Sequence, residues 1–340
     1  MKEINTIDAV GCVLCHDITQ IIPGKTKGAI FKKGHVVTEE DIPVLLSVGK
    51  DHLYIWEMDE NMLHENDAAE ILFSICKNDN MSGTQPEEGK IELKADIDGL
   101  FKVDVERLNR INALGEIIIS TRHSNFAVKK GDKLAGTRVI PLIIDKKKME
   151  AAKEIAGSEP LFHLLPFGHR KAGIVTTGNE VFYGRIKDAF GPVIRDKLFE
   201  FDVEVLGQTI INDEKEKITA IIKGYIDQGA DFIICTGGMS VDPDDTTPSA
   251  IKDTGAELVS YGAPVLPGAM FLLAYYGEKK IPIIGLPGCV MYAKRTIFDL
   301  VLPRIMAGEI LKAEDLSVLG HGGLCLSCPE CTFPNCGFGK

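Results

Sequence analysis

The second half of the chain alternates short apolar runs with segments of helical periodicity. Continuous apolar runs at 172–176, 203–207, 230–234 and 281–286 predict strands, and the run at 230–234 predicts a buried parallel strand. The segments between them predict helices at 192–201, 213–228, after Pro248 and at 292–305; within 213–228, for example, Ile218, Ile222 and Tyr225 fall at helical spacing. Strands that alternate with helices predict an α/β domain whose sheet is mostly parallel and carries helices on both faces.

The first half has a different pattern, which predicts a β-rich α+β region. Short strands are expected at 10–14, 29–31, 91–93, 115–120 and 139–144, and helices after Thr38 and at 67–77, 105–114 and 146–155. The polar stretch 78–89 has no apolar period, so we expect an exposed and mobile loop there. We therefore expect an N-terminal region at 1–165, an α/β domain at 171–312 and a tail at 313–340.

Three loops of the α/β domain follow strands and carry candidate chemistry. They span 177–180, 236–245 and 287–291, and ligands of open α/β sheets bind beyond the carboxyl ends of such strands. In the second loop, Gly237 and Gly238 allow a sharp turn and a close approach to a ligand. Its carboxylates, Asp242, Asp244 and Asp245, would hold a phosphate through a cation such as Mg²⁺. A surface turn rich in Gly and Asp remains the alternative.

Composition and charge limit the classes of molecule that the protein is expected to bind. The chain has 340 residues, 45% of them hydrophobic and 26% charged, which is ordinary for a soluble protein. Its formal net charge of −11 argues against general nucleic-acid binding and against binding to an anionic membrane. No apolar run approaches the length of a membrane span, and the first residues resemble no signal segment, so we expect a cytoplasmic protein.

Four of the nine cysteines lie close together near the C-terminus. Cys325, Cys328, Cys331 and Cys336 have the spacing Cys-x2-Cys-x2-Cys-x4-Cys. Four thiolates so close in sequence can bind an iron–sulfur cluster or a structural zinc, and the spacing is closer to cluster-binding runs than to zinc ribbons. A tail of free thiols without metal is the alternative.

The three loops also carry a family resemblance. Residues 171–308 resemble the molybdenum-cofactor biosynthesis domain shared by molybdopterin adenylyltransferases and molybdopterin molybdotransferases. Residues 1–165 resemble the molybdotransferase type more loosely. The motifs that carry the resemblance are Thr177-Gly178-Asn179-Glu180, Asp188-Ala189-Phe190-Gly191-Pro192, Thr236-Gly237-Gly238-Met239-Ser240, Asp245-Thr246-Thr247-Pro248 and Leu286-Pro287-Gly288.

The resemblance implies roles for residues at these positions. Molybdopterin would be the ligand, with Gly178 and Glu180 on the pterin side. Phosphate would be cradled by Gly237, Gly238 and Ser240. The remaining cofactor-binding positions of the motifs are Thr177, Asn179, Thr236, Pro287 and Gly288. Asp245 and Asp188 would be catalytic, and Asp242 and Asp245 would hold Mg²⁺.

The resemblance leaves two functions open. One is Mg²⁺-dependent transfer of molybdate or of an adenylyl group from ATP to molybdopterin. The other is a non-catalytic carrier or sensor of the cofactor that serves molybdoenzymes. The chain departs from the molybdotransferase pattern at Val265 to Met270, which contain no Lys, and at Cys289-Val290, which replace Asn-Pro. A homo-oligomer is a further expectation.

Overall fold

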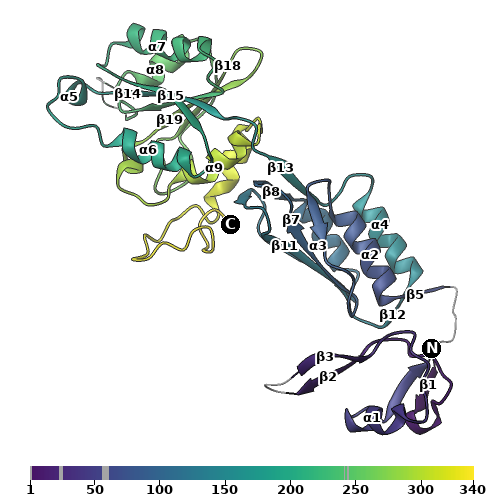
Figure 1. The fold of residues 1–340 in the computed structure, drawn as a ribbon. Helices are drawn as coiled ribbons and strands as arrows, with labels where there is room; N and C mark the ends of the chain where they lie inside the picture. Colours follow the sequence, from purple (N-terminus) through teal and green to yellow (C-terminus); the bar gives the residue numbers. More distant parts are fainter. Residues whose placement is uncertain (1, 23–25, 56–60, 241, 243–244) are drawn as a thin grey trace. The chain divides into compact units, whose positions relative to one another are not determined.

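The computed structural model describes residues 2–22, 26–55, 61–240, 242 and 245–340 (Figure 1). The chain folds into two compact units. Unit 1 comprises Met1–Asp96, Val103–Arg122 and Gly131–His163, and unit 2 comprises Ile97–Lys102, His123–Lys130 and Leu164–Lys340. This division differs from the expected one, because two short segments of the first half belong to unit 2 and the tail is part of that unit as well.

Unit 1 begins with a small β-rich part. Strand β1 (Lys2–Asn5) pairs antiparallel with β4 (His52–Ile55), and β2 (Ile18–Ile22) pairs with β3 (Thr26–Phe31). The 3₁₀ helix η1 (Thr6–Asp8) and the helix α1 (Asp41–Ser47) complete this part. The strand expected at 10–14 is wrong, because Val13 and Leu14 form only isolated bridges, to Val36 and Ile55.

The rest of unit 1 is an antiparallel sheet with helices on one face (Figure 1). The strand order is β6-β7-β11-β9, formed by β6 (Met81–Gly83), β7 (Lys90–Ala95), β11 (Lys133–Val139) and β9 (Ile117–Thr121). Helices α2 (Glu65–Cys76), α3 (Val105–Asn112) and α4 (Lys146–Ala156) pack on it. The short strands β5 (Met62–His64) and β12 (Ile143–Asp145) pair beside them. Strand β6 corrects the loop expected at 78–89, since Met81 is buried and the strand pairs with β7.

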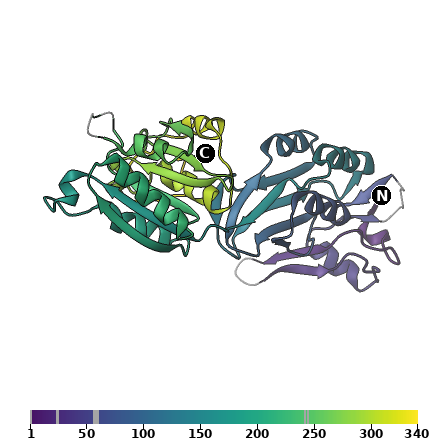
Figure 2. The same cartoon turned by 90° about the horizontal axis from the view of Figure 1, so that it is seen from above.

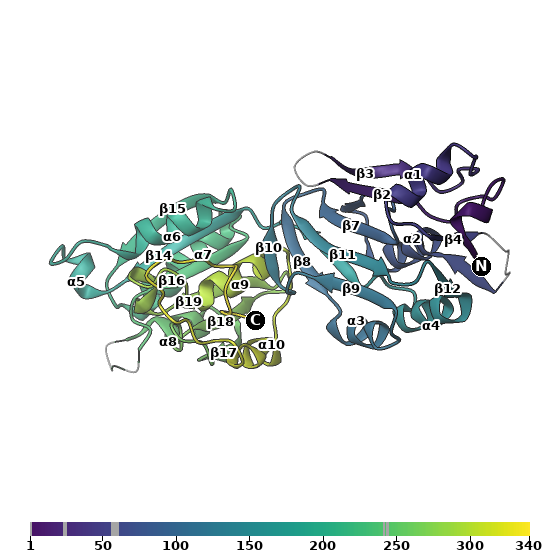
Figure 3. The same ribbon diagram turned by 90° about the horizontal axis from the view of Figure 1, so that it is seen from below.

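Unit 2 contains the α/β domain, built on one mixed six-stranded sheet. Figure 3 shows its strands in the order β15-β14-β16-β19-β18-β17. The first four are mutually parallel: β15 (Glu204–Ile211), β14 (Lys171–Thr177), β16 (Phe232–Thr236) and β19 (Ile281–Leu286). Strands β18 (Leu272–Tyr276) and β17 (Glu257–Tyr261) add an antiparallel pair at one edge. The mostly parallel sheet is therefore confirmed only in part.

Helices cover both faces of this sheet, as expected. Helices α7 (Lys215–Asp227) and α8 (Thr247–Asp253) lie on one face, and α6 (Phe190–Phe199) and α9 (Ile297–Met306) lie on the other (Figure 1). The strands alternate between the two cores: on β16, Phe232 and Ile234 pack toward α6 and α9, whereas Ile233 and Cys235 pack toward α7 and α8. Burial on both faces explains why β14, β16 and β19 read as continuous apolar runs, whereas the edge strand β15 has no buried residue.

Smaller elements complete unit 2 (Figure 2). A three-stranded sheet has the order β10-β8-β13, with β10 (Phe126–Val128), β8 (Gly99–Val103) and β13 (Phe162–Pro166). The short helix α5 (Asn179–Phe182) follows β14, the 3₁₀ helix η2 (Gly288–Met291) follows β19, and the tail begins with α10 (Ala313–Ser317) and η3 (Val318–Gly320). Helix α9 starts at Ile297 and not at the expected 292, because Thr296 and Asp299 form a capping box there.

Candidate functional site

The three predicted loops lie at one edge of the sheet. Thr176 on β14 is in register with Thr236 on β16, and Thr236 is in register with Leu286 on β19. All three strands are parallel, so the residues at and just beyond their ends leave the sheet side by side: Thr177 and Gly178, Gly237 and Gly238, and Pro287 and Gly288. The structure thus brings together the cofactor-binding positions expected from the motifs.

The Gly237-Gly238 turn packs directly on the end of β14. Gly237 has a φ of 80° and Gly238 a φ of 52°, both in the left-handed region that favours glycine. A Cβ atom on Gly237 would stand 2.0 Å from the main-chain oxygen of Thr177, and one on Gly238 would stand 2.8 Å from Oγ1 of Thr247. Both positions therefore require glycine, because the backbone has a positive φ and because a side chain would clash with its neighbours.

Hydrogen bonds tie the loops together beneath the turn. Oγ1 of Thr177 lies 2.9 Å from Oγ1 of Thr247, and both side chains are buried. The N–H of Asn179 donates to Oδ2 of Asp213, which follows β15, over 3.0 Å. Thr177 and Thr236 are buried as well, so their hydroxyl groups position the loops and are not open to a ligand.

Asp188 is held by hydrogen bonds at the start of α6. Its carboxylate accepts from the N–H groups of Phe190 and Gly191, at 2.9 Å and 3.1 Å, and from Nε2 of Gln208 at 2.6 Å. The same Nε2 donates to Oγ1 of Thr176 over 3.0 Å. Oγ1 of Thr176 also accepts from the Thr236 hydroxyl at 3.2 Å. Asp188 therefore connects the helix start to the strand ends of the site.

The acidic loop is anchored by Asp245. Its Oδ2 accepts from the N–H of Ser240 at 2.7 Å, and its own N–H donates to the carbonyl of Asp242 at 2.9 Å. The hydroxyl of Tyr261 donates to the carbonyl of Met239 at 2.8 Å. Burial, and then the nearby Asp245 carboxylate, raise the pKa of Tyr261. The phenol therefore remains a neutral donor at neutral pH.

Polar groups at the rim are open to a ligand. Glu180, Ser240, Asp242 and Gly288 are exposed, and Asn179 and Asp245 are half-buried. Asp244 lies outside the described residues. In the described part of the chain, no group of three or more His, Cys, Asp or Glu side chains is gathered into a single-ion site. A Mg²⁺ ion here would have to share its coordination with ligand phosphate and water, which is its usual habit.

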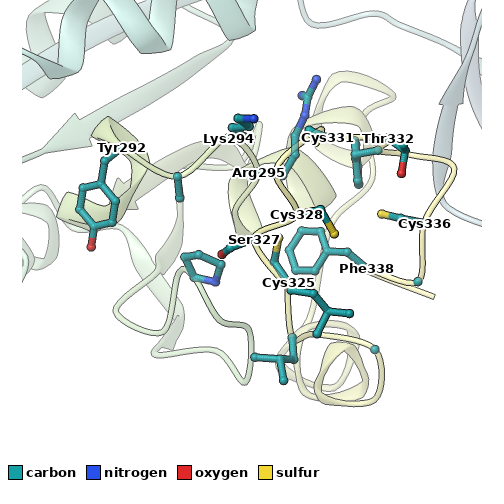
Figure 4. A pocket seen from close by; sticks show the side chains of 17 residues that line it. Tyr292, Lys294, Arg295, Cys325, Ser327, Cys328, Cys331, Thr332, Cys336 and Phe338 are labelled. Carbon is teal, nitrogen blue, oxygen red and sulfur yellow. The ribbon is translucent and has the colours of Figure 1, made fainter.

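The predicted tail cysteines surround a cavity in unit 2. Cys325 and Cys336 are half-buried against the α6/α9 core, and Cys328 and Cys331 are exposed. All four line a cavity of about 510 Å³ (Figure 4). Among the described residues, no three of these thiols form a group that could hold a single metal ion.

Sequence reasoning missed four residues that build the site. Gln208, Asp213, Thr247 and Tyr261 each join loops that are far apart in the chain. Thr247 belongs to the motif Asp245-Thr246-Thr247-Pro248, so the sequence contained a signal for its role. The other three carry no local signal, because their partners are set by the sheet order.

Comparisons with known proteins agree with the motifs. Residues 173–307 match the family described as "Probable molybdopterin binding domain". Residues 3–57 match a second family, described as "Domain of unknown function (DUF8806)".

Curated relatives match over a shorter stretch than the family domain. The CinA-like protein of Mycobacterium avium (strain 104) is 43% identical over 90 residues, which are 26% of this chain and 21% of that protein. The CinA-like protein of Mycobacterium tuberculosis (strain H37Rv) is 41% identical over 90 residues. The chain thus spans about a fifth of the length of these relatives.

Solved structures of lower identity also resemble the chain. The molybdopterin biosynthesis enzyme MoaB from Thermus thermophilus is 24% identical, with a TM-score of 0.35, and the match covers 42% of this chain and 99% of that one. A molybdopterin biosynthesis MoeA protein from Pyrococcus horikosii is 16% identical, with a TM-score of 0.33, over 72% of this chain and 79% of that one. Among the described residues, no helix has the length and apolar character to cross a membrane.

Proposed function

We propose that the domain at 173–307 binds molybdopterin at the edge formed by the ends of β14, β16 and β19. The convergence of the three glycine-containing loops is the observation that carries this proposal. Such an edge is where open α/β sheets bind ligands. The family described as a probable molybdopterin binding domain supports the identity of the ligand.

Residue roles follow from placement and from the family motifs. We assign Gly178 and Glu180 to the pterin side and the Gly237-Gly238 turn, with the exposed Ser240, to the phosphate. Asn179 and Gly288 complete the rim, whereas Pro287 is buried at the end of β19. The buried hydroxyls of Thr177 and Thr236 hold the loops in place.

Asp245 and Asp242 are the proposed ligands of Mg²⁺. Two carboxylates suit this ion, because it keeps several waters and takes its other ligands from phosphate. One oxygen of Asp245 already accepts from the N–H of Ser240, which leaves the other for the metal. Asp188 acts as a positioning residue in this proposal, since its carboxylate is occupied by the start of α6 and by Gln208.

The direct test is a binding titration. Purified chain is added to molybdopterin, and the pterin fluorescence is followed with and without Mg²⁺ and ATP. Binding at micromolar ligand supports the proposal, and absence of binding under all conditions rejects it. The matched glycine variants described below separate a specific effect on the site from general strain.

Transfer and carriage are the two forms that this function can take. Transfer requires turnover of molybdate or ATP on bound molybdopterin with Mg²⁺. The carrier form is favoured by the loop Val265 to Met270, which contributes no Lys to hold an oxyanion. Product formed from molybdate or ATP would reject the carrier form, and tight binding without product would reject transfer. A cytoplasmic protein that delivers the cofactor to molybdoenzymes, as a homo-oligomer, remains part of the proposal.

A further inference from the structure

The tail forms a closed loop whose two ends are tied together. The N–H of Gly339 donates to the carbonyl of Gly322 over 2.9 Å, so residues 322–339 begin and end at the same place. Backbone hydrogen bonds to Leu266 fix the first cysteine of the loop. The N–H of Leu266 donates to the carbonyl of Gly323, and the N–H of Cys325 donates to the carbonyl of Leu266, both over 2.8 Å. The loop is therefore held by backbone hydrogen bonds as part of unit 2.

Aromatic side chains anchor the same loop from inside. Phe338 is buried in the α6/α9 core, and Phe333 packs against that core. The ring of Phe333 lies 5.8 Å from the ring of Phe126 on β10, and the guanidinium of Arg295 lies 5.0 Å from the Phe333 ring centroid. Between its hydrogen-bonded ends at Gly322 and Gly339 the loop carries all four cysteines, which line the cavity of about 510 Å³ (Figure 4).

The cavity walls have the character expected around an anionic body of several atoms. Lys294 and Arg295 line it, and none of its described lining residues is acidic. Nζ of Lys294 donates to the carbonyl of Pro329 at 2.9 Å, so this cation also holds the cysteine loop. A cluster bound by four thiolates is anionic, and nearby cations stabilise it.

The geometry distinguishes a cluster from a single zinc ion. In a zinc site each sulfur lies about 2.3 Å from one ion, so the four sulfurs crowd around a point. Here the four cysteines line a cavity of about 510 Å³, which has room for a body of several atoms between the sulfurs. We propose that Cys325, Cys328, Cys331 and Cys336 bind one [4Fe–4S] cluster in this cavity.

The cluster site adjoins the ligand loops of the domain. The wall segment Tyr292 to Arg295 directly follows η2, which begins in the third loop at Gly288. Leu266, which pairs with the tail, precedes Pro267, which also lines the cavity. A cluster at this position lies next to the loop that follows β19, and its presence orders a wall of that loop.

The test uses the full chain, purified without oxygen and reconstituted with ferrous iron, sulfide and a thiol reductant. After removal of unbound metal, we expect about four iron and four sulfide per chain, visible absorbance that bleaches with dithionite and an EPR signal of the reduced cluster. Reconstitution should also raise the thermal midpoint, because the metal binds the folded loop. Zinc without sulfide, any other iron stoichiometry or metal-free protein would overturn the proposal.

The variant to compare is Cys328→Ala with Cys331→Ala. These two thiols are exposed, so their removal leaves the core packing intact, whereas Cys325 and Cys336 pack against the core. The double variant should lose the iron, the sulfide and the gain in thermal midpoint, and should match the metal-free wild type in circular dichroism. Cys12→Ala, in unit 1, is the control and should keep the full cluster. Retention of four iron by the double variant would contradict the assignment. Pterin titration is a separate measurement, so failure here leaves the proposed function untouched.

Discussion

The main-chain oxygen of Thr177 occupies the space that a side chain on Gly237 would need. An ideal Cβ on Gly237 would lie 2.0 Å from that oxygen, which is far inside van der Waals contact. Because the oxygen belongs to the backbone at the end of β14, neither side can yield without moving a strand end. The approach of these two residues sets the spacing between two ligand loops.

Gly237→Ala should therefore push the loops after β14 and β16 apart. We expect a loss of more than about 1 kcal/mol in the free energy of unfolding, from the positive φ and the clash together. Molybdopterin binding should weaken roughly tenfold or more. Urea denaturation and the fluorescence titration measure the two effects.

Gly229→Ala is the matched control for this variant. Gly229 has a φ of 88°, close to that of Gly237, but no atom within 4 Å of its ideal Cβ. It should show the strain of a positive φ without loss of binding. Equal loss of binding in the two variants would show that the close approach to Thr177 does not shape the site.

Asp245→Asn tests the proposed metal ligand. The amide keeps the shape and can still accept from the N–H of Ser240, but it removes the charge. If the chain transfers a group with Mg²⁺, the rate should fall roughly 100-fold or more, and pterin binding should change much less. Asp253→Asn, on α8 and paired with Lys215, is the control and should leave both unchanged. Parallel loss of rate and binding in Asp245→Asn would instead indicate a structural role.

Much of the α/β domain could be predicted from the sequence, because its strands β14, β16 and β19 are buried on both faces and read as apolar runs. The loops after β14, β16 and β19 followed from the strand ends and from the motifs. The start of α9 was missed although Thr296 and Asp299 spell a capping box. The remaining features depend on contacts between segments that are distant in the sequence. Residues 10–14 have a strand-like pattern but form only isolated bridges. Asp213 accepts a hydrogen bond from Asn179 because β15 lies next to β14 in the sheet.

Asp299→Ala should be the most damaging of these changes to stability. Asp299 Oδ1 accepts from Nζ of Lys197 at 2.6 Å and from Arg295 at 2.7 Å, and Oδ2 accepts from the N–H of Thr296 at 2.7 Å. Burial alone would lower the pKa of Arg295, but the Asp299 carboxylate raises it overall. Removal of the acid leaves the buried Lys197 without this counter-charge and uncaps α9, which should cost about 3–5 kcal/mol.

Chemical denaturation measures this loss, with Glu257→Ala as the comparison. Glu257 is 72% exposed in its pair with Lys280, and exposed pairs contribute little. If Asp299→Ala were no more destabilising than Glu257→Ala, the buried charge cluster would not hold the segment that precedes α9.

Asp315→Asn should remove part of the pH dependence of the free energy of unfolding. Burial raises the pKa of the Asp315 carboxyl, but hydrogen bonds from Arg304 and from the N–H of Lys312 outweigh it and leave the pKa below the ordinary value. A lowered folded pKa gives stability that is present above the unfolded pKa of about 3.9 and is lost as the pH falls through the folded pKa.

The difference in unfolding free energy between wild type and Asp315→Asn should thus be largest near neutral pH and shrink below about pH 4. A difference between wild type and Asp315→Asn that stays constant down to strong acid would contradict the role of the Arg304 pair.

The interleaving of the chain between the two units constrains how the protein can be divided. Segments 97–102 and 123–130 belong to unit 2, although each is flanked by residues of unit 1. Leu100 and Phe126 from these segments belong to the same core cluster as α9 and Phe338. A fragment that starts at residue 171 would therefore leave part of that core uncovered and would tend to aggregate when produced alone. A protease that nicks one connection would leave the two units joined by the others.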